Sequence, residues 1–413
     1  MPDHYDELET RSPQARESAL LKSLPAQIEN ARQKAPAYGA LLEGVSANSI
    51  DSRSALAGLP VTRKTELLER QADEPPFGGF AATATGELAH VFASPGPIYE
   101  PEARCEDYWR MARALFAAGF RSGELVHNTF SYHFTPAGFM LESGARALGC
   151  PVFPAGIGQT ELQVQAISQL QPTGYVGTPS FLKLILDKAA ELETVVSCID
   201  KALVSGEALP PSLRRSLADR GVAVRQCYAT ADLGLIAYES EAMQGMIVDE
   251  GVILEIVRPG TGDPVAAGEV GEVVVTTLNP DYPLIRFATG DLSAFMEDGA
   301  SSCGRTGPRI KGWMGRADQT TKVRGMFVHP SQVAAVLKRH PEVLKGRLVI
   351  DNADNQDFMT LRCEVAGAPS EGLGAAIASS IRELCKLRGE VVFEAPGGLA
   401  NDGKVIDDVR SYE

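Results

Sequence analysis

Residues 283–292 read Pro-Leu-Ile-Arg-Phe-Ala-Thr-Gly-Asp-Leu, an apolar run that ends in a Thr-Gly turn. The apolar part predicts a buried strand, and the turn places the carboxylate of Asp291 at the end of that strand. A carboxylate has two acceptor oxygens, so it can take paired hydrogen bonds from a vicinal diol such as ribose. Arg316, in the Gly-Arg-Ala-Asp of 315–318, adds a forked donor one short segment later. Thr-Gly-Asp alone is also an ordinary surface turn, so other motifs must decide between the two interpretations.

The part of the chain before residue 251 alternates between short apolar runs and longer segments with helical spacing. Runs bounded by Gly, Pro or Ser predict strands at 125–130, 151–154, 174–177 and 202–205. Apolar residues at helical spacing predict helices at 12–34, 102–119, 137–148, 159–170, 179–193 and 211–219. Regular alternation of strand and helix predicts an α/β fold with stacked layers and a largely parallel sheet.

From about residue 251 the pattern becomes β-rich. Strands expected at 252–257 and 271–278 predict a small β-rich subdomain over 251–314. Further on, two strands, a helix, two strands, a helix and a strand are expected in that order, which fits a small α+β domain. We therefore predict an N-terminal domain over 1–317 and a C-terminal domain over 318–413, with Asp318 at its entrance.

Composition excludes several classes of protein. The 413 residues carry a formal net charge of -14 without a basic run, which argues against a nucleic-acid partner. No apolar run approaches the roughly 18 residues of a membrane span, and the polar, acidic start does not resemble a signal peptide. The seven cysteines are scattered, as in reduced cytosolic proteins. We expect a cytoplasmic protein without a membrane partner.

Polar motifs follow two more of the predicted strands. Gly206 and Glu207 come directly after the strand at 202–205, at the edge where open α/β sheets bind ligands. Residues 228–234 read Tyr-Ala-Thr-Ala-Asp-Leu-Gly at the end of the next strand. Near the C-terminus, Lys404 follows Asn-Asp-Gly. Each motif alone is equally a turn or a solvated loop, and their order is what indicates a common site.

In this order the motifs resemble those of the adenylate-forming acyl-CoA synthetases, and of the phenylacetate-CoA ligase branch in particular. The resemblance spans roughly residues 85–410. It implies a large N-terminal adenylation domain, a small mobile C-terminal domain, and the ATP-dependent activation of an aryl or arylacetic acid as acyl-adenylate for transfer to CoA. Two alternatives stay open: an adenylating enzyme that loads the phosphopantetheine of a carrier protein, and a partly degenerate homologue that binds AMP, CoA or acyl-CoA. A homodimer is the expectation for this branch.

The resemblance also implies roles for the residues of the nucleotide site. Gly206 and Glu207 would lie along the adenine, and Tyr228 would stack on it. The Thr230 hydroxyl would contact the α-phosphate. Asp232 would hold Mg²⁺, although it is one methylene shorter than the glutamate of the family pattern. Asp291 would bind the ribose with support from Arg316.

A second set of implied roles concerns the two half-reactions. The ammonium of Lys404 would bridge the substrate carboxylate and the α-phosphate during adenylation. Arg324 and Gly325 would lie along the pantetheine arm of CoA, where a residue without a side chain permits close approach. Because only one of these surfaces can face the site at a time, the C-terminal domain would rotate about a hinge at Asp318.

The N-terminal half adds a substrate side and a phosphate loop. Tyr132, Phe134 and Phe139 would line an aryl pocket, although single aromatic residues are more often part of a core. The loop expected to cradle phosphates reads Ala-Ser-Pro-Gly-Pro-Ile-Tyr-Glu-Pro over 93–101, with Ser94, Gly96 and Glu100 at the aligned positions. Its prolines remove backbone donors. Glu100 stands where the family has a lysine, and its charge is expected to repel phosphate.

Overall fold

The computed structural model describes residues 3–94, 98–258, 262–297, 301–317, 319, 321–324, 326–328, 330–353, 356–400 and 404–410. The chain divides into two compact units, Met1–Met314 and Gly315–Glu413. Each unit has a hydrophobic core of its own.

The larger unit is built around an eight-stranded sheet with the strand order β14-β10-β9-β8-β7-β6-β4-β5. Its parallel part consists of β5 (Val152–Pro154), β4 (Val126–Asn128), β6 (Gly174–Gly177), β7 (Lys201–Val204) and β8 (Ala223–Thr230). Three antiparallel strands continue it: β9 (Gly234–Tyr238), β10 (Met246–Val248) and β14 (Arg309–Ile310). The α/β fold with a largely parallel sheet is therefore confirmed.

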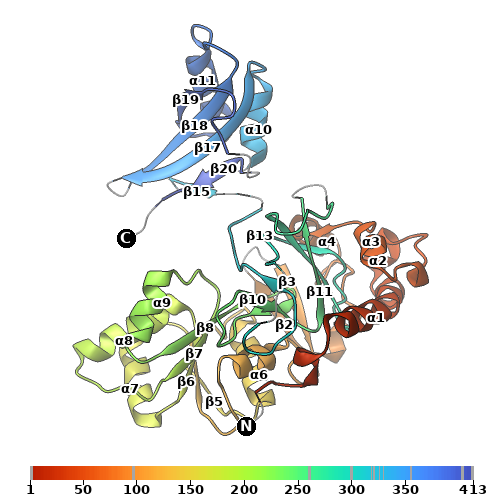
Figure 1. The fold of residues 1–413 in the computed structure, drawn as a ribbon, viewed down its shortest axis with the longest axis vertical. Coiled ribbons are helices and arrows are strands. Elements are labelled where there is room, and N and C mark those ends of the chain that lie inside the picture. The colour runs from red at the N-terminus through yellow and green to blue at the C-terminus, as the bar shows by residue number, and fades with distance from the viewer. Residues whose placement is uncertain are drawn as a thin grey trace. The chain divides into compact units, whose positions relative to one another are not determined.

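Helices cover both faces of the parallel strands (Figure 1). One face carries α7 (Thr160–Leu170), α8 (Pro179–Glu191) and α9 (Pro211–Ala218), and the other carries α5 (Met111–Ala117) and α6 (Ala137–Ala147). Successive side chains of a strand point to opposite faces. In β6, Tyr175 accordingly packs in the core of α7–α9, whereas Val176 packs in the core of α5 and α6. Burial on both faces explains why these strands read as continuous apolar runs.

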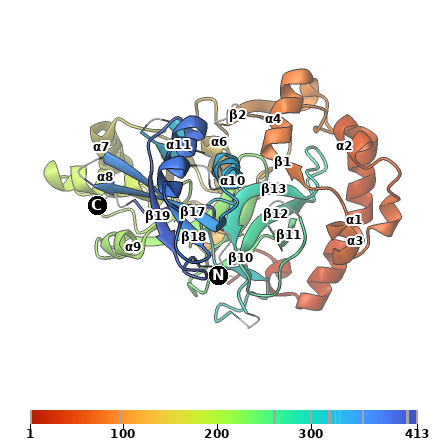
Figure 2. The same cartoon turned by 90° about the horizontal axis from the view of Figure 1, so that it is seen from above.

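A second sheet, with the order β1-β13-β12-β11, forms a β-rich subdomain of the same unit. Its strands are β1 (Thr62–Arg63), β11 (Val252–Val257), β12 (Gly271–Thr277) and β13 (Phe287–Ser293), and a separate hairpin consists of β2 (Leu88–Ser94) and β3 (Ile98–Ala103). The accompanying helices are α1 (Pro13–Lys34), α2 (Pro36–Leu41), α3 (Arg53–Ala57) and α4 (Lys64–Asp73), with short 3-10 turns η1 (Glu7–Thr10), η2 (Ala47–Ser49) and η3 (Thr85–Glu87). Figure 2 shows α1, α2 and α3 beside β11–β13, with which they share one apolar core.

The helix predicted at 102–119 is wrong in its first half. Glu102 pairs with β2 as part of β3, and the helix α5 begins only at Met111. Asp107 and Arg110 have φ values of 46° and 61°, which a right-handed helix cannot contain. The Asp107 carboxylate accepts a hydrogen bond of 2.8 Å from the Met111 N–H, which caps the start of α5.

The smaller unit is an α+β domain, as expected. Its four-stranded sheet has the order β19-β18-β17-β20. The elements are β15 (Thr321–Val323), β16 (Met326–Val328), α10 (Pro330–Lys338), β17 (Val343–Ala353), β18 (Gln356–Val365), α11 (Leu373–Cys385), β19 (Glu390–Glu394) and β20 (Ile406–Asp408). Both helices pack on the sheet through one apolar core. Within the described parts of the chain, no helix combines the length and apolarity that a membrane crossing requires.

Candidate active site

A cavity of ≈ 430 Å³ lies where β4, β6, β7 and β8 reach their carboxyl ends. Parallel strands end at one edge of a sheet, so the residues that follow them gather there. The residues that line the cavity at or just after the ends of these strands include Thr129, Phe130, Thr178, Ser205, Gly206 and Thr230. Three positions predicted from the sequence, Ser94, Gly206 and Thr230, therefore meet at one cavity.

The wall of this cavity is apolar apart from hydroxyl groups. Its remaining surface comes largely from Met111, Met140, Leu141, Ile157 and Phe181. Among the described residues that line it, none is an Asp, Glu, Lys, Arg or His. A charged group in this cavity would lose hydration without gaining a counter-charge, which is costly. The cavity therefore suits an apolar group.

The three aromatic residues predicted for the substrate pocket do not line this cavity. The Tyr132 hydroxyl accepts a hydrogen bond of 2.8 Å from Asn128 Nδ2, and its ring packs on Phe139 with 5.2 Å between centroids. Phe134 is 83% exposed. Neighbouring residues of a helix point about 100° apart, so α6 presents Met140 to the cavity and turns Phe139 elsewhere.

Asp291 and Tyr228, predicted to bind ribose and adenine, are in direct contact. The Tyr228 hydroxyl donates a hydrogen bond of 2.8 Å to Asp291 Oδ2 and lies 3.1 Å from Thr289 Oγ1. The indole N–H of Trp313 donates to Asp291 Oδ1 at 3.1 Å. Each oxygen of this buried carboxylate thus accepts one of these hydrogen bonds, and because a carboxylate oxygen has two acceptor sites, a ribose diol could bind without displacing either donor.

Trp313 is not among the residues predicted from the sequence. Its segment is aligned with β13 by two hydrogen bonds, from the Met314 N–H to the Leu292 carbonyl at 2.9 Å and from the Ser293 hydroxyl to the Gly312 carbonyl at 2.7 Å. The indole itself is 52% exposed. A tryptophan two residues before the Gly-Arg-Ala-Asp motif was the signal in the sequence, but only the pairing with β13 shows what it contacts.

The turn of Gly206 and Glu207 follows β7 and contacts the start of α8 through a hydrogen bond. Gly206 has a φ of 83°, a conformation that favours glycine. The exposed carboxylate of Glu207 accepts a hydrogen bond of 2.6 Å from the Ser180 N–H in the first turn of α8. Because a helix N-terminus carries partial positive charge, this contact is favourable and holds the turn against the cavity.

Asp232 lies in the turn after β8 and points into the protein. Its side chain is 0% exposed, and its Oδ2 lies 2.7 Å from Nζ of Lys64, whose side chain is 35% exposed. The Thr230 hydroxyl accepts a hydrogen bond of 3.1 Å from the Leu233 N–H and so closes this turn. Lys64, the first residue of α4, is a second residue near the site that was not predicted from the sequence.

Glu100 is a buried carboxyl group beside Asp232. Its Oε1 accepts a hydrogen bond of 2.6 Å from the Ser94 hydroxyl, and Ser94 also lines the cavity. Burial, and after it the charge of Asp232, raise the pKa of Glu100 to about 8. The raised pKa favours the neutral form of Glu100, and a neutral carboxyl group would not repel phosphate as expected from the sequence. Gly96 lies outside the described residues.

The surroundings of Asp232 do not fit a magnesium ion. Mg²⁺ prefers six oxygen ligands at about 2.0–2.1 Å in octahedral geometry. Asp232 instead contacts an ammonium group, and the described residues contain no group of three or more His, Cys, Asp or Glu that could hold a metal. The prediction of Asp232 as a metal ligand thus finds no support in its contacts.

Lys404 lies just before β20 in the smaller unit. Its Nζ contacts Asp407 Oδ1 at 2.7 Å, and Asp407 Oδ2 lies 3.7 Å from the guanidinium of Arg347. Lys404 is half-buried, whereas Arg347 is buried. The ammonium is thus oriented by a carboxylate that is itself held by a second cation.

The other residues predicted in the smaller unit are placed less completely. The Arg324 N–H donates to Asp357 Oδ2 at 3.0 Å, and its guanidinium donates to the Asp357 carbonyl at 2.9 and 2.6 Å. Arg316 is exposed. Gly325 and the hinge residue Asp318 lie outside the described residues, and their roles stay predictions.

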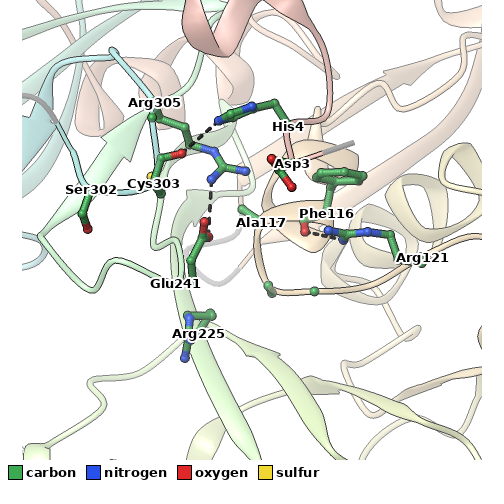
Figure 3. Close-up of a pocket in the computed structure, with 13 residues that line it drawn as sticks. Asp3, His4, Phe116, Ala117, Arg121, Arg225, Glu241, Ser302, Cys303 and Arg305 are labelled. Carbon is green, nitrogen blue, oxygen red and sulfur yellow. Dashed lines mark hydrogen bonds and ion pairs between the residues drawn. The ribbon is translucent and has the colours of Figure 1, made fainter. Parts of the chain in front are cut away.

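A second cavity of ≈ 620 Å³ in the larger unit contains none of the predicted site residues (Figure 3). His4 Nε2 lies 2.9 Å from the Cys303 carbonyl oxygen. Arg305 makes ion pairs with Glu9 at 3.1 Å and with Glu241 at 3.4 Å. These contacts hold the N-terminal segment against the loop before β14. We therefore assign the residues around this cavity a structural role.

Sequence similarity to known proteins identifies the family of this chain. The model of the AMP-binding enzyme family matches residues 107–279. The chain is 32% identical to the phenylacetate-coenzyme A ligase of Thermus thermophilus over 384 residues, which cover 88% of this chain and 84% of that protein. The chain belongs to the phenylacetate-CoA ligase family. It is also 30% identical to the ligase of the same name from Escherichia coli over 379 residues, 87% of this chain and 85% of that protein.

Solved structures of a CoA ligase share the fold of this chain. The fold is similar to 2-hydroxyisobutyryl-CoA ligase in an open conformation with 2-HIB-AMP and CoA, with a TM-score of 0.74 and 26% identity. That similarity covers 97% of this chain and 92% of the solved chain. The same ligase in the thioesterification state gives a TM-score of 0.72. The resemblance seen in the sequence is confirmed, and the chain is an adenylate-forming acid–thiol ligase.

Proposed function

We propose that this ligase activates an aryl or arylacetic acid with ATP and transfers the acyl group to CoA. The observation that supports this substrate class is the ≈ 430 Å³ cavity whose described lining carries no charged side chain. An aromatic ring can fill such a cavity without desolvating a charge. The hydroxyls of Ser94, Thr178 and Thr230 on its wall could meet the polar carboxylate end of the acid.

The proposed adenylation step uses residues of both units. A carboxylate oxygen attacks the α-phosphorus of ATP, a bond forms between them, and pyrophosphate leaves. Asp291 and Tyr228 hold the adenosine, the Thr230 hydroxyl contacts the α-phosphate, and the Lys404 ammonium stabilises the negative charge that develops there. In the second step the CoA thiolate attacks the acyl carbonyl carbon, and AMP leaves with its electron pair.

Several finer points belong to the same proposal. CoA would pass Arg324 and Gly325, and Asp318 would be the hinge between the half-reactions. Mg²⁺ enters only as the counter-ion that ATP carries, and no step is assigned to it at Asp232. A homodimer and a cytoplasmic location are also proposed, the latter because all seven cysteines are free thiols.

ATP–pyrophosphate exchange across a panel of aromatic and aliphatic acids tests the first half-reaction. We expect exchange that depends on the acid and is strongest with aromatic acids. No exchange with any acid, together with measurable binding of AMP or CoA, would favour the degenerate homologue and contradict the proposal. Exchange restricted to short acids that carry a second charged group besides the carboxylate would contradict the assignment of the cavity to an aromatic ring.

The acceptor needs a separate experiment. Purified acyl-adenylate is offered with CoA or with a carrier protein bearing phosphopantetheine, and thioester formation is followed by mass spectrometry. We expect acyl-CoA, because the similar 2-hydroxyisobutyryl-CoA ligase structures contain CoA. Faster transfer to the carrier protein would favour the alternative acceptor.

A further inference from the structure

Lys64, Glu100 and Asp232 form a buried group of charges next to the cavity. They come from the start of α4, from β3 and from the turn after β8. Glu100 is 0% exposed as a residue, and the Asp232 side chain is 0% exposed. The Lys64 ammonium lies 2.7 Å from Asp232 Oδ2, and its charge partly offsets the rise that burial causes in the pKa of Glu100.

Strand pairing places Lys64 close to the nucleotide residues. β1 runs parallel to β13 with Arg63 opposite Ala288, and Lys64 begins α4 directly after this pair, just as Thr289 follows Ala288 in β13. Thr289 is the residue whose hydroxyl meets the Tyr228 hydroxyl at 3.1 Å. On the other side, Ala231 lines the cavity directly before Asp232. The ammonium therefore contacts a residue that directly follows a cavity-lining position.

A carboxylate as buried as that of Asp232 needs a compensating positive charge. A divalent cation or an ammonium group could each supply it. An N–O separation of 2.7 Å is direct contact, and it leaves no space for a metal ion between Nζ and Oδ2. A metal ion bound to the same oxygen would also be repelled by the ammonium. Lys64 and a metal ion on Asp232 Oδ2 thus exclude each other, whereas the buried Oδ1 has no hydrogen-bond partner among the described residues and is disfavoured for a metal only by the charge of the nearby ammonium.

We propose that Lys64 is the built-in cation of Asp232 and stands where the family resemblance implies a protein-bound divalent metal ion. Asp232 then positions the ammonium and does not ligate a metal. The metal that accompanies ATP is bound by the nucleotide alone. This last consequence rests on the proposed function, whereas the pairing of Lys64 with Asp232 can be tested without any reaction.

Binding of Mn²⁺ alone to the nucleotide-free protein tests the pairing, with free Mn²⁺ measured by electron paramagnetic resonance. Wild type and Asp232→Asn are expected to bind Mn²⁺ equally. Lys64→Ala should bind it about tenfold or more tightly, because a buried carboxylate then lacks its counter-charge. The double variant Lys64→Ala/Asp232→Asn should return to the wild-type level. The proposal would be overturned if the wild-type protein bound Mn²⁺ and Asp232→Asn did not. It would also be overturned if Lys64→Ala bound Mn²⁺ no more tightly than wild type.

Arg63→Ala is the matched control, because it removes the neighbouring cation from another buried carboxylate. Arg63 contacts Glu272 at 3.1 Å, and the Glu272 side chain is 4% exposed. This variant should leave Mn²⁺ binding at the wild-type level. A gain equal to that of Lys64→Ala would show a general charge effect and overturn the proposal. If Lys64→Ala does not fold, the comparison of wild type with Asp232→Asn still decides.

The dependence of pyrophosphate exchange on free Mg²⁺ provides a second measurement. We expect the free Mg²⁺ concentration that gives half-maximal exchange to be the same for Asp232→Asn and wild type, even if their maximal rates differ. A shift of about fivefold or more to higher Mg²⁺ would mean that Asp232 ligates the metal, and would overturn the proposal. Absence of exchange in the wild type contradicts the proposed function instead, and the Mn²⁺ experiment stays decisive for Lys64.

Discussion

Replacing the carboxylate of Asp291 by an amide should weaken AMP binding through the ribose. In the structure, Tyr228 and Trp313 each donate one hydrogen bond to Asp291, at 2.8 and 3.1 Å. Each oxygen keeps a second acceptor site for a ribose diol, and we take the net gain from the diol as about one charge-assisted hydrogen bond. Such a bond contributes about 1.5–3 kcal/mol, so Asp291→Asn should weaken AMP binding about 10- to 150-fold.

Isothermal titration calorimetry with AMP and with 2′,3′-dideoxy-AMP isolates this contribution. Wild type should prefer AMP by the same factor, whereas Asp291→Asn should bind the two nucleotides with similar affinity. Trp313→Phe is the matched control, because it removes one donor but keeps the carboxylate. It should lower AMP affinity by no more than about threefold.

Two results would refute this reasoning. If Asp291→Asn bound AMP within about threefold of wild type, the carboxylate would not be the ribose ligand. If Asp291→Asn lost affinity equally for AMP and the dideoxy nucleotide, the substitution would act through the position of Tyr228 and not through the diol.

Three further predictions concern catalysis and stability. Lys404→Ala should lower pyrophosphate exchange about 100- to 1,000-fold but spare thioester formation from a supplied acyl-adenylate, and equal loss of both steps would contradict the two-step role. The pKa of Glu100 is raised to about 8 in the folded protein. Above the usual glutamate pKa, the folded state therefore keeps a proton that the unfolded chain has released. The free energy of unfolding should accordingly fall as the pH rises toward 8. Glu100→Gln should flatten this fall in urea denaturation between about pH 5 and 8, whereas an unchanged slope would assign it to other groups. Gly177→Ala should cost about 1–3 kcal/mol of unfolding free energy, because its Cβ would overlap the Thr129 and Tyr175 hydroxyls, while Gly86→Ala, with nothing within 4 Å, should be neutral by the same measurement.

Local patterns predicted the regular elements well because each pattern has a local cause. The alternation of apolar runs and helical segments between 125 and 219 reappears as β4 to α9, since buried parallel strands and amphipathic helices need those spacings. The exception is the segment before Met111. Its helical spacing is overridden by strand pairing of β3 with β2 and by the positive φ of Asp107, neither of which a periodicity can show.

Site residues that follow the ends of strands were predicted from the sequence. Site residues that are brought in by packing of distant segments were not. Asp291 and Tyr228 were named from motifs, and the structure joins them by one hydrogen bond. Trp313 and Lys64 were missed, because each is brought to its carboxylate by contact with an element distant in sequence. The roles of Lys404, Arg324 and the hinge stay predictions.

The sequence by itself determined the family, the α/β architecture and the strand ends at which polar residues gather, because motif order and side-chain periodicity are properties of neighbouring residues. Only the tertiary structure decided the burial of Glu100, which raises its pKa, the partner of Asp232 and the residues that line the cavity. These depend on burial and on charges brought together from the start of α4, from β3 and from the turn after β8. The phosphate loop lacks the lysine of the family pattern, and a lysine from another segment, Lys64, contacts Asp232 near the site. The pattern of neighbouring residues could not show this contact.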